Sequence, residues 1–480
     1  MTDEINRRDF MKRAALTSAV SLSMAGVSTR NVLGANDRIR LGVIGTGRQG
    51  RDDMQNFMKH GVEVVAVCDV YQPNLDKGLK AASGKYLGND NWESNPNGNV
   101  KAVKDFREVL DDKGIDVVLV GTPDHWHALP MVEACKAGKD VYVEKPICVV
   151  VEEGQKMVAA ARRYNRVVQV GLWQRSNLHF QKAVELVQGG LLGKVSFVRT
   201  WNYGNTFPDG QGTYPDSDPP AGLDWDFWLG PAPKVAYNFQ RFGVGDNRWS
   251  TFRYFYDYAN GWPGDWAVHL MDIVQWAMQT EGPKGITAMG FKKFIQDNTE
   301  TPDTLEITWE YEGDHPFIAT YENRECNGNS MYGHGYGIEF HGTDATMFLD
   351  RDGFEVFPEP YSEVDYREVH RPAGGQAERR QLGKAPVMKM DRVDDGLLVH
   401  VGNMLDCMRT RKRPQSDIEY GHRSSSCCLL GNVALRSKEH LEWDVANQKL
   451  LKGGPAAQRL LGREYRAPWK LTVQENSAVS

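Results

Sequence analysis

A glycine-rich turn near the start of the chain constrains its fold more than any other feature. Residues 39–44 form a short apolar run, and the turn that follows reads Gly45-Thr46-Gly47-Arg48-Gln49-Gly50. A second apolar run at 62–67 ends at Asp69, about 20 residues beyond the turn. A glycine pattern alone is common, but strand, turn, helix, strand and acidic residue in this order are typical of a dinucleotide-binding unit.

The residues of this turn have separate predicted roles. Gly45 permits the tight turn, Gly47 lets the backbone approach a diphosphate, and Gly50 allows the following helix to pack closely. The N-terminus of that helix, with Arg48 and Gln49 in its first turn, is expected to hold the diphosphate because it presents free N–H groups and a positive dipole. The alternative is a glycine turn in another kind of α/β protein.

Asp69 bears on which dinucleotide is bound. A carboxylate at the end of the second strand is expected to accept hydrogen bonds from the ribose hydroxyls. It would also repel a 2′-phosphate, so NAD is favoured over NADP, although Arg48 in the turn weakens this preference.

Further strands are predicted at 116–120, 140–143 and 167–170, alternating with helices after His127 and at 151–165. This alternation predicts an α/β fold with a doubly wound parallel sheet, in which ligands bind beyond the carboxyl ends of the strands. The residues at those ends that we expect to line the cofactor are Thr122, Pro123, His127, Glu144 and Lys145.

Composition excludes several classes of protein. The chain has 480 residues and a formal net charge of -6, without the dense basic face that nucleic-acid binding requires. Its seven cysteines lack disulfide or zinc spacing. His125 and His127 have no matching carboxylate or thiol, so we expect no metal site. No apolar run reaches the length of a membrane span, so no integral membrane segment is expected after signal removal.

The N-terminal segment resembles an export signal. Residues 6–12 read Asn-Arg-Arg-Asp-Phe-Met-Lys, and a mildly apolar stretch follows at 14–27. This order predicts a Tat-type signal over 1–35, with cleavage after Gly26 or Ala35, recognition by the Tat export machinery and a periplasmic or other extracytoplasmic location. The alternative is an ordinary basic N-terminus.

Motifs in both halves resemble the glucose-fructose oxidoreductase, inositol dehydrogenase and rhizopine-catabolism (Gfo/Idh/MocA) family. They are Glu144-Lys145-Pro146 after Thr122-Pro123, then Asp265 and His269, and the run at 417–423. The resemblance implies a Rossmann domain, set at 36–160, and a C-terminal α/β domain with an open, mainly antiparallel sheet, set at 161–440. Residues 441–480 are assigned to a C-terminal tail.

The second half has a pattern that agrees with such a sheet. Strands are predicted at 195–202, 285–294, 304–311, 317–321, 337–341 and 345–349, with a long surface loop at 204–222. Open sheets in this family often pair between subunits, so a homo-oligomer is expected.

The resemblance also assigns catalytic roles. It makes His269 the acid/base for the hydroxyl proton, Asp265 the residue that orients it, and Lys145 the cation that polarises the hydroxyl oxygen. Asp265 and His269 stand four apart on a predicted helix and share one face. The alternative for such a pair is a surface ion pair. The family usually has Gly between them, whereas this chain has Trp266-Ala267-Val268.

An aromatic-rich stretch at 249–262 precedes this helix. Sugars stack on aromatic rings and hydrogen-bond to charged groups, so we expect a sugar or polyol pocket lined by Arg175, Trp249, Arg253 and Tyr258. We also expect about half of these aromatics to be core packing.

Together these features predict an oxidoreductase that acts on a hydroxyl of a sugar, sugar derivative or inositol. Export would separate the protein from free cofactor, so the NAD is expected to be tightly bound. One alternative is a hydrolase similar to the NAD-dependent α-N-acetylgalactosaminidases, although the Tyr-Pro-Thr-His run of that branch is missing from this sequence. A sugar or nucleotide binder without catalysis is the other.

Overall fold

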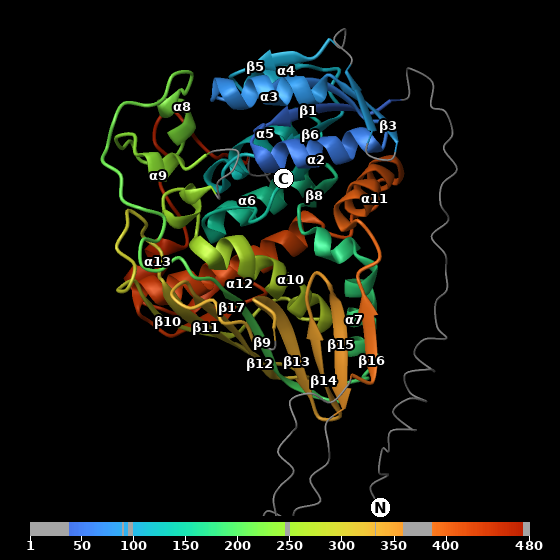
Figure 1. Ribbon diagram of the computed structural model, residues 1–480, viewed down its shortest axis with the longest axis vertical. Coiled ribbons are helices and arrows are strands. Elements are labelled where there is room, and N and C mark those ends of the chain that lie inside the picture. Colours follow the sequence, from blue (N-terminus) through green and yellow to red (C-terminus); the bar gives the residue numbers. More distant parts are fainter. Residues whose placement is uncertain are drawn as a thin grey trace, which may run out of the picture.

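The computed structural model describes residues 38–88, 91–94, 99–244, 250–331, 333–358 and 386–473. Two β-sheets lie one above the other, with helices between them (Figure 1). The predicted export signal lies outside the described residues. Within those ranges, no helix combines the length and the apolar character that crossing a membrane requires.

The first sheet has six parallel strands in the order β5-β2-β1-β6-β7-β8. Each strand predicted in this half coincides with an observed one to within one residue at either end. The prediction of a doubly wound parallel sheet is therefore confirmed. The strands are β1 (Arg40–Ile44), β2 (Glu63–Cys68), β5 (Lys101–Val103), β6 (Val117–Val120), β7 (Asp140–Val143) and β8 (Val168–Val170).

Helices connect these strands, and a separate hairpin follows the second helix. The helices are α2 (Arg48–Lys59), α3 (Gln72–Ala82), α4 (Arg107–Asp111), α5 (Ala128–Lys136) and α6 (Val151–Arg163). The hairpin consists of β3 (Gly84–Gly88) and β4 (Asn91–Ser94). Strands β6 and β7 are buried at every position, which is the reason for their continuous apolar sequences.

The second sheet has ten strands in the order β16-β15-β14-β13-β9-β12-β11-β10-β17-β18. Its strand pairs are antiparallel except for β9 with β12, so the predicted open, mainly antiparallel sheet is confirmed. The strands are β9 (Val195–Tyr203), β10 (Gly285–Phe291), β11 (Thr304–Tyr311), β12 (Phe317–Arg324), β13 (Tyr336–Gly342), β14 (Ala345–Leu349), β15 (Gly353–Pro358), β16 (Met388–Asp391), β17 (Leu441–Asp444) and β18 (Lys449–Lys452).

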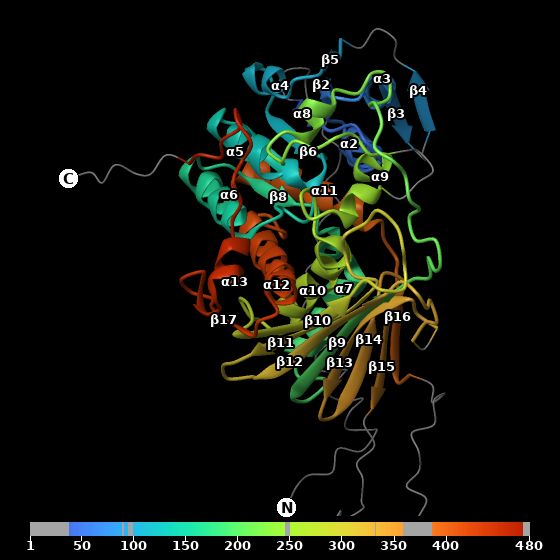
Figure 2. The same cartoon turned by 90° about the vertical axis from the view of Figure 1, so that its left-hand side faces the viewer.

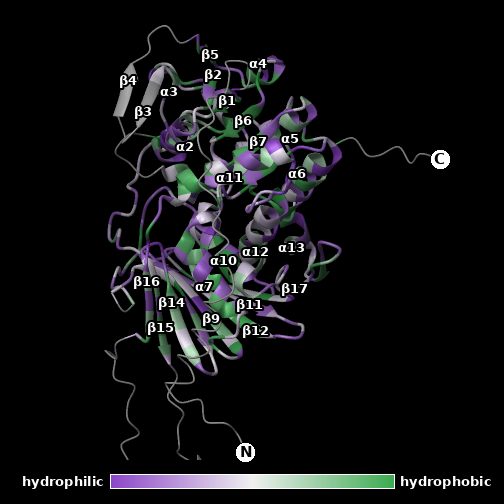
Figure 3. Ribbon diagram, turned by 90° about the vertical axis from the view of Figure 1, so that its right-hand side faces the viewer, coloured by the Kyte–Doolittle hydropathy of each residue, from purple (hydrophilic) through white to green (hydrophobic). Residues whose placement is uncertain are grey.

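Buried and more exposed residues alternate along β11, as expected when one face of the sheet packs on a core and the other faces solvent. Figure 3 shows hydrophilic and hydrophobic bands along the strands of this sheet. Strands β17 and β18 lie in the segment assigned to a C-terminal tail, so the start of that segment belongs to the sheet.

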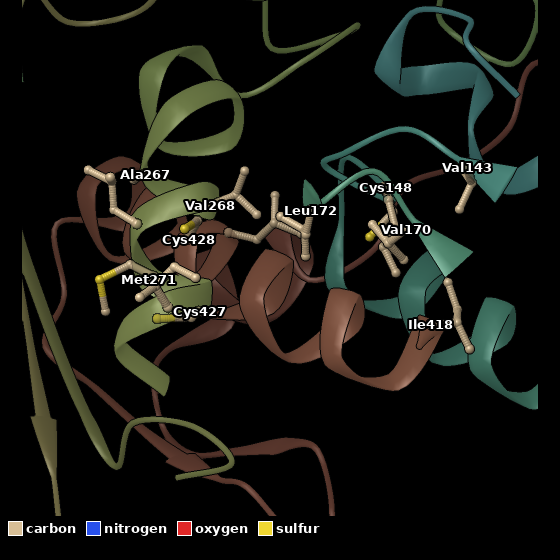
Figure 4. Close-up of a cluster of buried hydrophobic side chains, with 14 of the residues drawn as sticks. Val143, Cys148, Val170, Leu172, Ala267, Val268, Met271, Ile418, Cys427 and Cys428 are labelled. Atoms are coloured by element: carbon tan, nitrogen blue, oxygen red, sulfur yellow. The ribbon is translucent and has the colours of Figure 1, made fainter. Parts of the chain in front are cut away.

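The helices between the sheets join the two halves through one continuous core. They are α7 (Leu178–Gln188), α10 (Val268–Ala277) and α12 (Ile418–Ser437), whereas α11 (Gly396–Thr410) packs in a second cluster with α2 and strands of the first sheet. In Figure 4, Val143 and Val170 of the first sheet lie in the same cluster as Met271 of α10 and Cys427 of α12. The halves are therefore held together by apolar packing as well as by the chain.

The chain between β9 and α10 builds a third packing unit beside the two sheets (Figure 2). It includes α8 (Trp225–Leu229), α9 (Phe239–Phe242), η4 (Thr251–Tyr254) and the π-helical turn η5 (Pro263–Ala267). The predicted loop at 204–222 is irregular. Beyond α13 (Pro455–Leu460), the chain returns to this unit, where the Trp469 ring stacks on Phe227 with centroids 5.4 Å apart.

The backbone geometry of the turn between β1 and α2 explains why glycine occupies two of its positions. Gly45 has a φ of +90°, and its N–H donates to the carbonyl of Cys68 at 2.8 Å. A Cβ on Gly50 would lie 2.0 Å from the Gly45 carbonyl oxygen, whereas a Cβ on Gly47 would have no neighbour within 4 Å. Gly50 therefore serves packing, and Gly47 leaves open space at the start of the helix.

We expect Gly50→Ala and Gly47→Ala to separate these two roles. Gly50→Ala forces the helix away from the turn and should lower the free energy of unfolding by about 1–3 kcal/mol. Gly47→Ala should leave thermal unfolding unchanged while weakening dinucleotide binding, as measured by calorimetric titration. Equal stability of Gly50→Ala and the unsubstituted protein would contradict this interpretation of the turn.

Candidate functional site

A cavity of 940 Å³ lies where the carboxyl ends of the first sheet face the second half of the chain. One part of its wall is the glycine turn and the other is formed by η5, α10 and the turn after β14. Cavities of this size accommodate a cofactor or a drug-sized ligand, and the position beyond parallel strand ends is where open α/β sheets bind ligands.

The glycine turn and Asp69 form one end of the cavity, and Gly45, Gly47, Arg48 and Gln49 all line it. The Asp69 carboxylate accepts the N–H of Thr46 at 2.9 Å on Oδ2 and the N–H of Tyr71 at 2.9 Å on Oδ1. These bonds fix the carboxylate at the cavity edge, and each oxygen keeps acceptor capacity for a hydroxyl.

These residues fit a dinucleotide. Gly47 leaves space where its side chain would be, and it precedes a helix of 12 residues whose first N–H groups point toward that space. Several buried polar atoms of the cavity residues have no partner within the described part of the chain: Thr122 Oγ1, Glu144 Oε1, Asp265 Oδ2 and His269 Nδ1. Polar atoms of this kind are normally satisfied by a ligand or water.

The predicted strand-end residues also line the cavity, and His127 connects their two loops. Its Nδ1 lies 2.6 Å from the Pro146 carbonyl oxygen, and its Nε2 lies 2.8 Å from the Thr122 carbonyl oxygen. Burial lowers the pKa of His127 to about 4. Because both partners are carbonyl oxygens, a neutral ring can donate to only one of them at a time, and in either tautomer the ring lies between the two loops that carry Thr122 and Pro146.

Glu144 faces a second buried carboxyl group, that of Asp53 on α2. Burial raises the pKa of Glu144 to about 7. Burial and the charge of Glu144 together raise the pKa of Asp53 well above its usual value. Two carboxyl groups in one apolar setting cannot both ionise easily, so near neutral pH the pair retains a proton.

Three charged side chains meet at the centre of the cavity. Lys145 Nζ donates to the Asp265 carbonyl at 2.8 Å and to its Oδ1 at 3.1 Å, and Arg253 Nε donates to the same Oδ1 at 2.7 Å. Burial alone would raise the pKa of Asp265, but Lys145 and Arg253 hold it at about 2. Asp265 is therefore a carboxylate at all ordinary pH values.

His269 lies in the same cavity, in the first turn of α10, and is 3% exposed. Burial, followed by the charges of Lys145 and Arg351, holds its pKa well below its usual value. Within the described residues no hydrogen bond joins Asp265 to His269, whereas the family resemblance implied that Asp265 orients this ring. The π-helical turn instead directs the Asp265 carboxylate to Lys145 and Arg253.

Of the residues predicted to line the sugar pocket, not all line the cavity. Arg253 lines the cavity, but Tyr258 is fully buried in the aromatic packing unit. Arg175 does not line the cavity, because its guanidinium pairs with the Asp272 carboxylate at 2.8 Å in the core. Trp249 lies outside the described residues.

Other cavity residues were not among those expected to line the cofactor or the sugar pocket. Trp173, Trp266 and Arg351 line the end near His269. Asp124, which follows β6, lines the cavity as well, and burial raises its pKa to about 7. The sequence signal that could have identified Asp124 was its position shortly after a predicted strand. No local signal indicates Arg351, because it reaches the site only when the second sheet is assembled.

Relatives of known sequence match part of the chain. A glycosyl hydrolase family 109 protein of Shewanella baltica (strain OS185) is 27% identical over 220 residues, which are 40% of this chain and 44% of that protein. An α-N-acetylgalactosaminidase of Shewanella oneidensis is 26% identical over 220 residues, with the same shares, 40% and 44%. The matched region thus spans less than half the length of these relatives.

Solved structures resemble the fold over most of the chain. The WlbA dehydrogenase of Bordetella pertussis, solved with NADH and UDP-GlcNAcA, has a TM-score of 0.58 and 16% identity, covering 85% of this chain and 99% of its own. Levoglucosan dehydrogenase, solved with NADH and levoglucosan, has a TM-score of 0.53 and 16% identity, covering 82% and 95%.

Family models match both halves. Residues 39–172 match that of an oxidoreductase family with an NAD-binding Rossmann fold, and residues 176–371 match that of its C-terminal α/β domain. By these matches, which cover most of the chain, the protein is a member of the Gfo/Idh/MocA oxidoreductase family.

Proposed function

We propose that this oxidoreductase uses NAD to oxidise a hydroxyl group of a sugar, a sugar derivative or an inositol. The observation that carries the proposal is one cavity in which Lys145 and His269 lie beyond the strand ends while the glycine turn and Asp69 form the other end. The dinucleotide would lie from the turn toward Lys145, which leaves the end near His269 for the substrate. The sugar ligands of the two similar solved structures also support a sugar substrate.

The residues have complementary roles in this reaction. When bound, NAD supplies the acceptor for the hydride that leaves the carbinol carbon. His269 is uncharged because of its lowered pKa, so a ring nitrogen can take the hydroxyl proton, as a weaker base than an ordinary histidine. The Lys145 ammonium is held by Asp265, and it stabilises the negative charge that develops on the same oxygen.

Asp69 supports NAD rather than NADP as the cofactor. Its carboxylate is fixed at the cavity edge by the N–H groups of Thr46 and Tyr71. A 2′-phosphate beside it would be repelled, which leaves the ribose diol of NAD as the better partner.

The N-terminal twin-arginine sequence supports Tat export to an extracytoplasmic compartment, where free nicotinamide cofactor is not available for exchange. A tightly bound NAD that is restored within each cycle would function there.

The exposed side chains Met289, Phe291 and Ile318 on β10 and β12 support pairing of two subunits through the open sheet.

Purified mature protein is expected to carry about one NAD per chain, because the cavity holds the nucleotide from the turn to the strand ends. The amount of bound NAD is measured by mass spectrometry of the supernatant after heat denaturation. Sugars and inositols added to the native protein should then raise the absorbance of reduced nicotinamide. Apo protein that turns over added NAD freely would contradict a resident cofactor.

Replacement of His269 by Asn should lower kcat/KM for sugar oxidation by about 10²–10⁴ because the proton acceptor is lost. Lys145→Met should have a comparable effect, since the developing alkoxide loses its cation. Both variants should keep bound NAD, and the exposed Lys156→Ala on α6 is the matched control. Unchanged kcat/KM in both variants would show that the site is assigned wrongly.

A second candidate is an NAD-dependent glycoside hydrolase, because the sequence relatives include glycosyl hydrolase family 109 proteins. Transient oxidation of a sugar carbon would then labilise the glycosidic bond, with no net change of the cofactor. Release of nitrophenol from an aryl α-N-acetylgalactosaminide without accumulation of reduced nicotinamide would favour this candidate over the dehydrogenase.

A further inference from the structure

Arg351 brings a positive charge into the substrate end of the cavity from outside any recognised motif. It lies in the turn between β14 and β15, and it lines the cavity together with Trp266 and His269. Its guanidinium carbon is 4.4 Å from the ring centroid of Trp173 and 4.6 Å from that of Trp266. Two aromatic rings therefore hold the guanidinium in place.

Within the part of the chain that the structure describes, the contacts of Arg351 do not compensate its charge. Its Nε donates to the buried Gln174 Oε1 at 3.2 Å, which fixes the orientation of the fork. Among the described residues, no carboxylate forms an ion pair with it, in contrast to Lys145 and Arg253, which share Asp265. Even a partly buried guanidinium without a counter-ion is costly, and burial lowers the pKa of Arg351 accordingly.

The turn that carries Arg351 is rigid. Asp350 Oδ1 accepts the N–H groups of Asp352 at 2.8 Å and Gly353 at 3.2 Å, and its Oδ2 lies 2.9 Å from His334 Nδ1. The N–H of Arg392 donates to the Asp352 carbonyl at 2.7 Å. These bonds preorganise the guanidinium, so little ordering cost remains for a ligand.

Other charges around Arg351 do not neutralise it. Asp265, Glu144 and the Tyr336 phenol favour its charged form, and Arg392 opposes it. However, Asp265 is already shared by two cations, and the pKa of Glu144 is raised to about 7. The substrate end of the cavity thus has surplus positive charge close to His269.

We propose that the substrate is an acidic sugar, and that Arg351 binds its carboxylate or phosphate group while His269 and Lys145 face the hydroxyl to be oxidised. The proposal rests on the function proposed above and names its substrate class. A planar guanidinium fork matches two oxygens of either anion, and the Trp173 and Trp266 rings offer apolar faces for the sugar ring. Arg351 is therefore a specificity-determining residue.

The test compares D-glucuronate, D-glucose 6-phosphate and D-glucose with the NAD-loaded full chain. Binding is measured by calorimetric titration and oxidation by the absorbance of reduced nicotinamide. At least one acidic sugar should bind more tightly than glucose, and the stronger of the two identifies the carboxylate or the phosphate as the preferred anion. Equal binding of all three sugars would overturn the proposal, even if all were oxidised.

Variants at Arg351 make the test specific. Arg351→Gln should weaken binding of the acidic sugar by on the order of 10- to 100-fold and change the binding of glucose much less. Arg351→Lys keeps the charge without the fork and should recover part of the loss. The exposed Arg409→Gln on α11 is the control. Acidic-sugar binding that is unchanged in a folded Arg351→Gln protein would overturn the proposal.

These outcomes separate the inference from the proposed function. If acidic sugars bind through Arg351 but no sugar is ever oxidised by NAD-loaded protein, the proposed reaction is wrong and the anion site stands. If neutral sugars bind as tightly as acidic ones and are oxidised equally fast, the reaction stands and the anion site is wrong.

Discussion

The shared carboxylate of Asp265 is the interaction on which the site depends. Lys145 follows β7 of the parallel sheet, Arg253 belongs to the aromatic packing unit, and Asp265 lies in the turn before α10. Lys145 is far in sequence from the other two, which both belong to the second half of the chain. Because the Asp265 side chain is only 5% exposed to solvent, its attraction to both cations is screened only weakly. The two halves of the protein therefore meet at a fixed charge constellation.

Burial and this constellation together set the protonation states around it. Burial is the largest factor that lowers the pKa of His269, and the charges of Lys145 and Arg351 lower it further. Burial meanwhile favours the protonated forms of Glu144 and Asp124. The cavity thus combines a neutral imidazole, a held ammonium and carboxyl groups that titrate near neutral pH, a combination suited to moving a proton from a hydroxyl.

Much of the fold could be predicted from the sequence because its determinants are local. Apolar runs predicted β1, β2, β6, β7 and β8, and the glycine turn predicted which end of that sheet forms the cavity. Strand β5 was missed because it has three residues, two of them exposed. Strands β17 and β18 were missed because short, charged segments give little periodic signal.

The substrate end was harder to predict, because contacts between distant segments decide it. An aromatic-rich sequence does not reveal which rings face the cavity, so Tyr258 was expected there and is buried elsewhere. Arg175 was expected in the pocket, but its charge is satisfied in the core by Asp272. Arg351, with no motif around it, faces the cavity. Whether a charged residue faces the cavity or the core depends on the partner that it meets in the folded chain, and the sequence alone does not identify that partner.

The central claim is that a hydroxyl-bearing carbon of the sugar and a resident NAD react within one cavity. The most direct measurement uses a sugar deuterated at its carbinol carbons, mixed with protein as purified and without added nucleotide. Mass spectrometry of the nucleotide released on denaturation should then show one deuterium on the nicotinamide. Oxidised sugar accompanied by unlabelled cofactor would contradict direct transfer to a resident NAD.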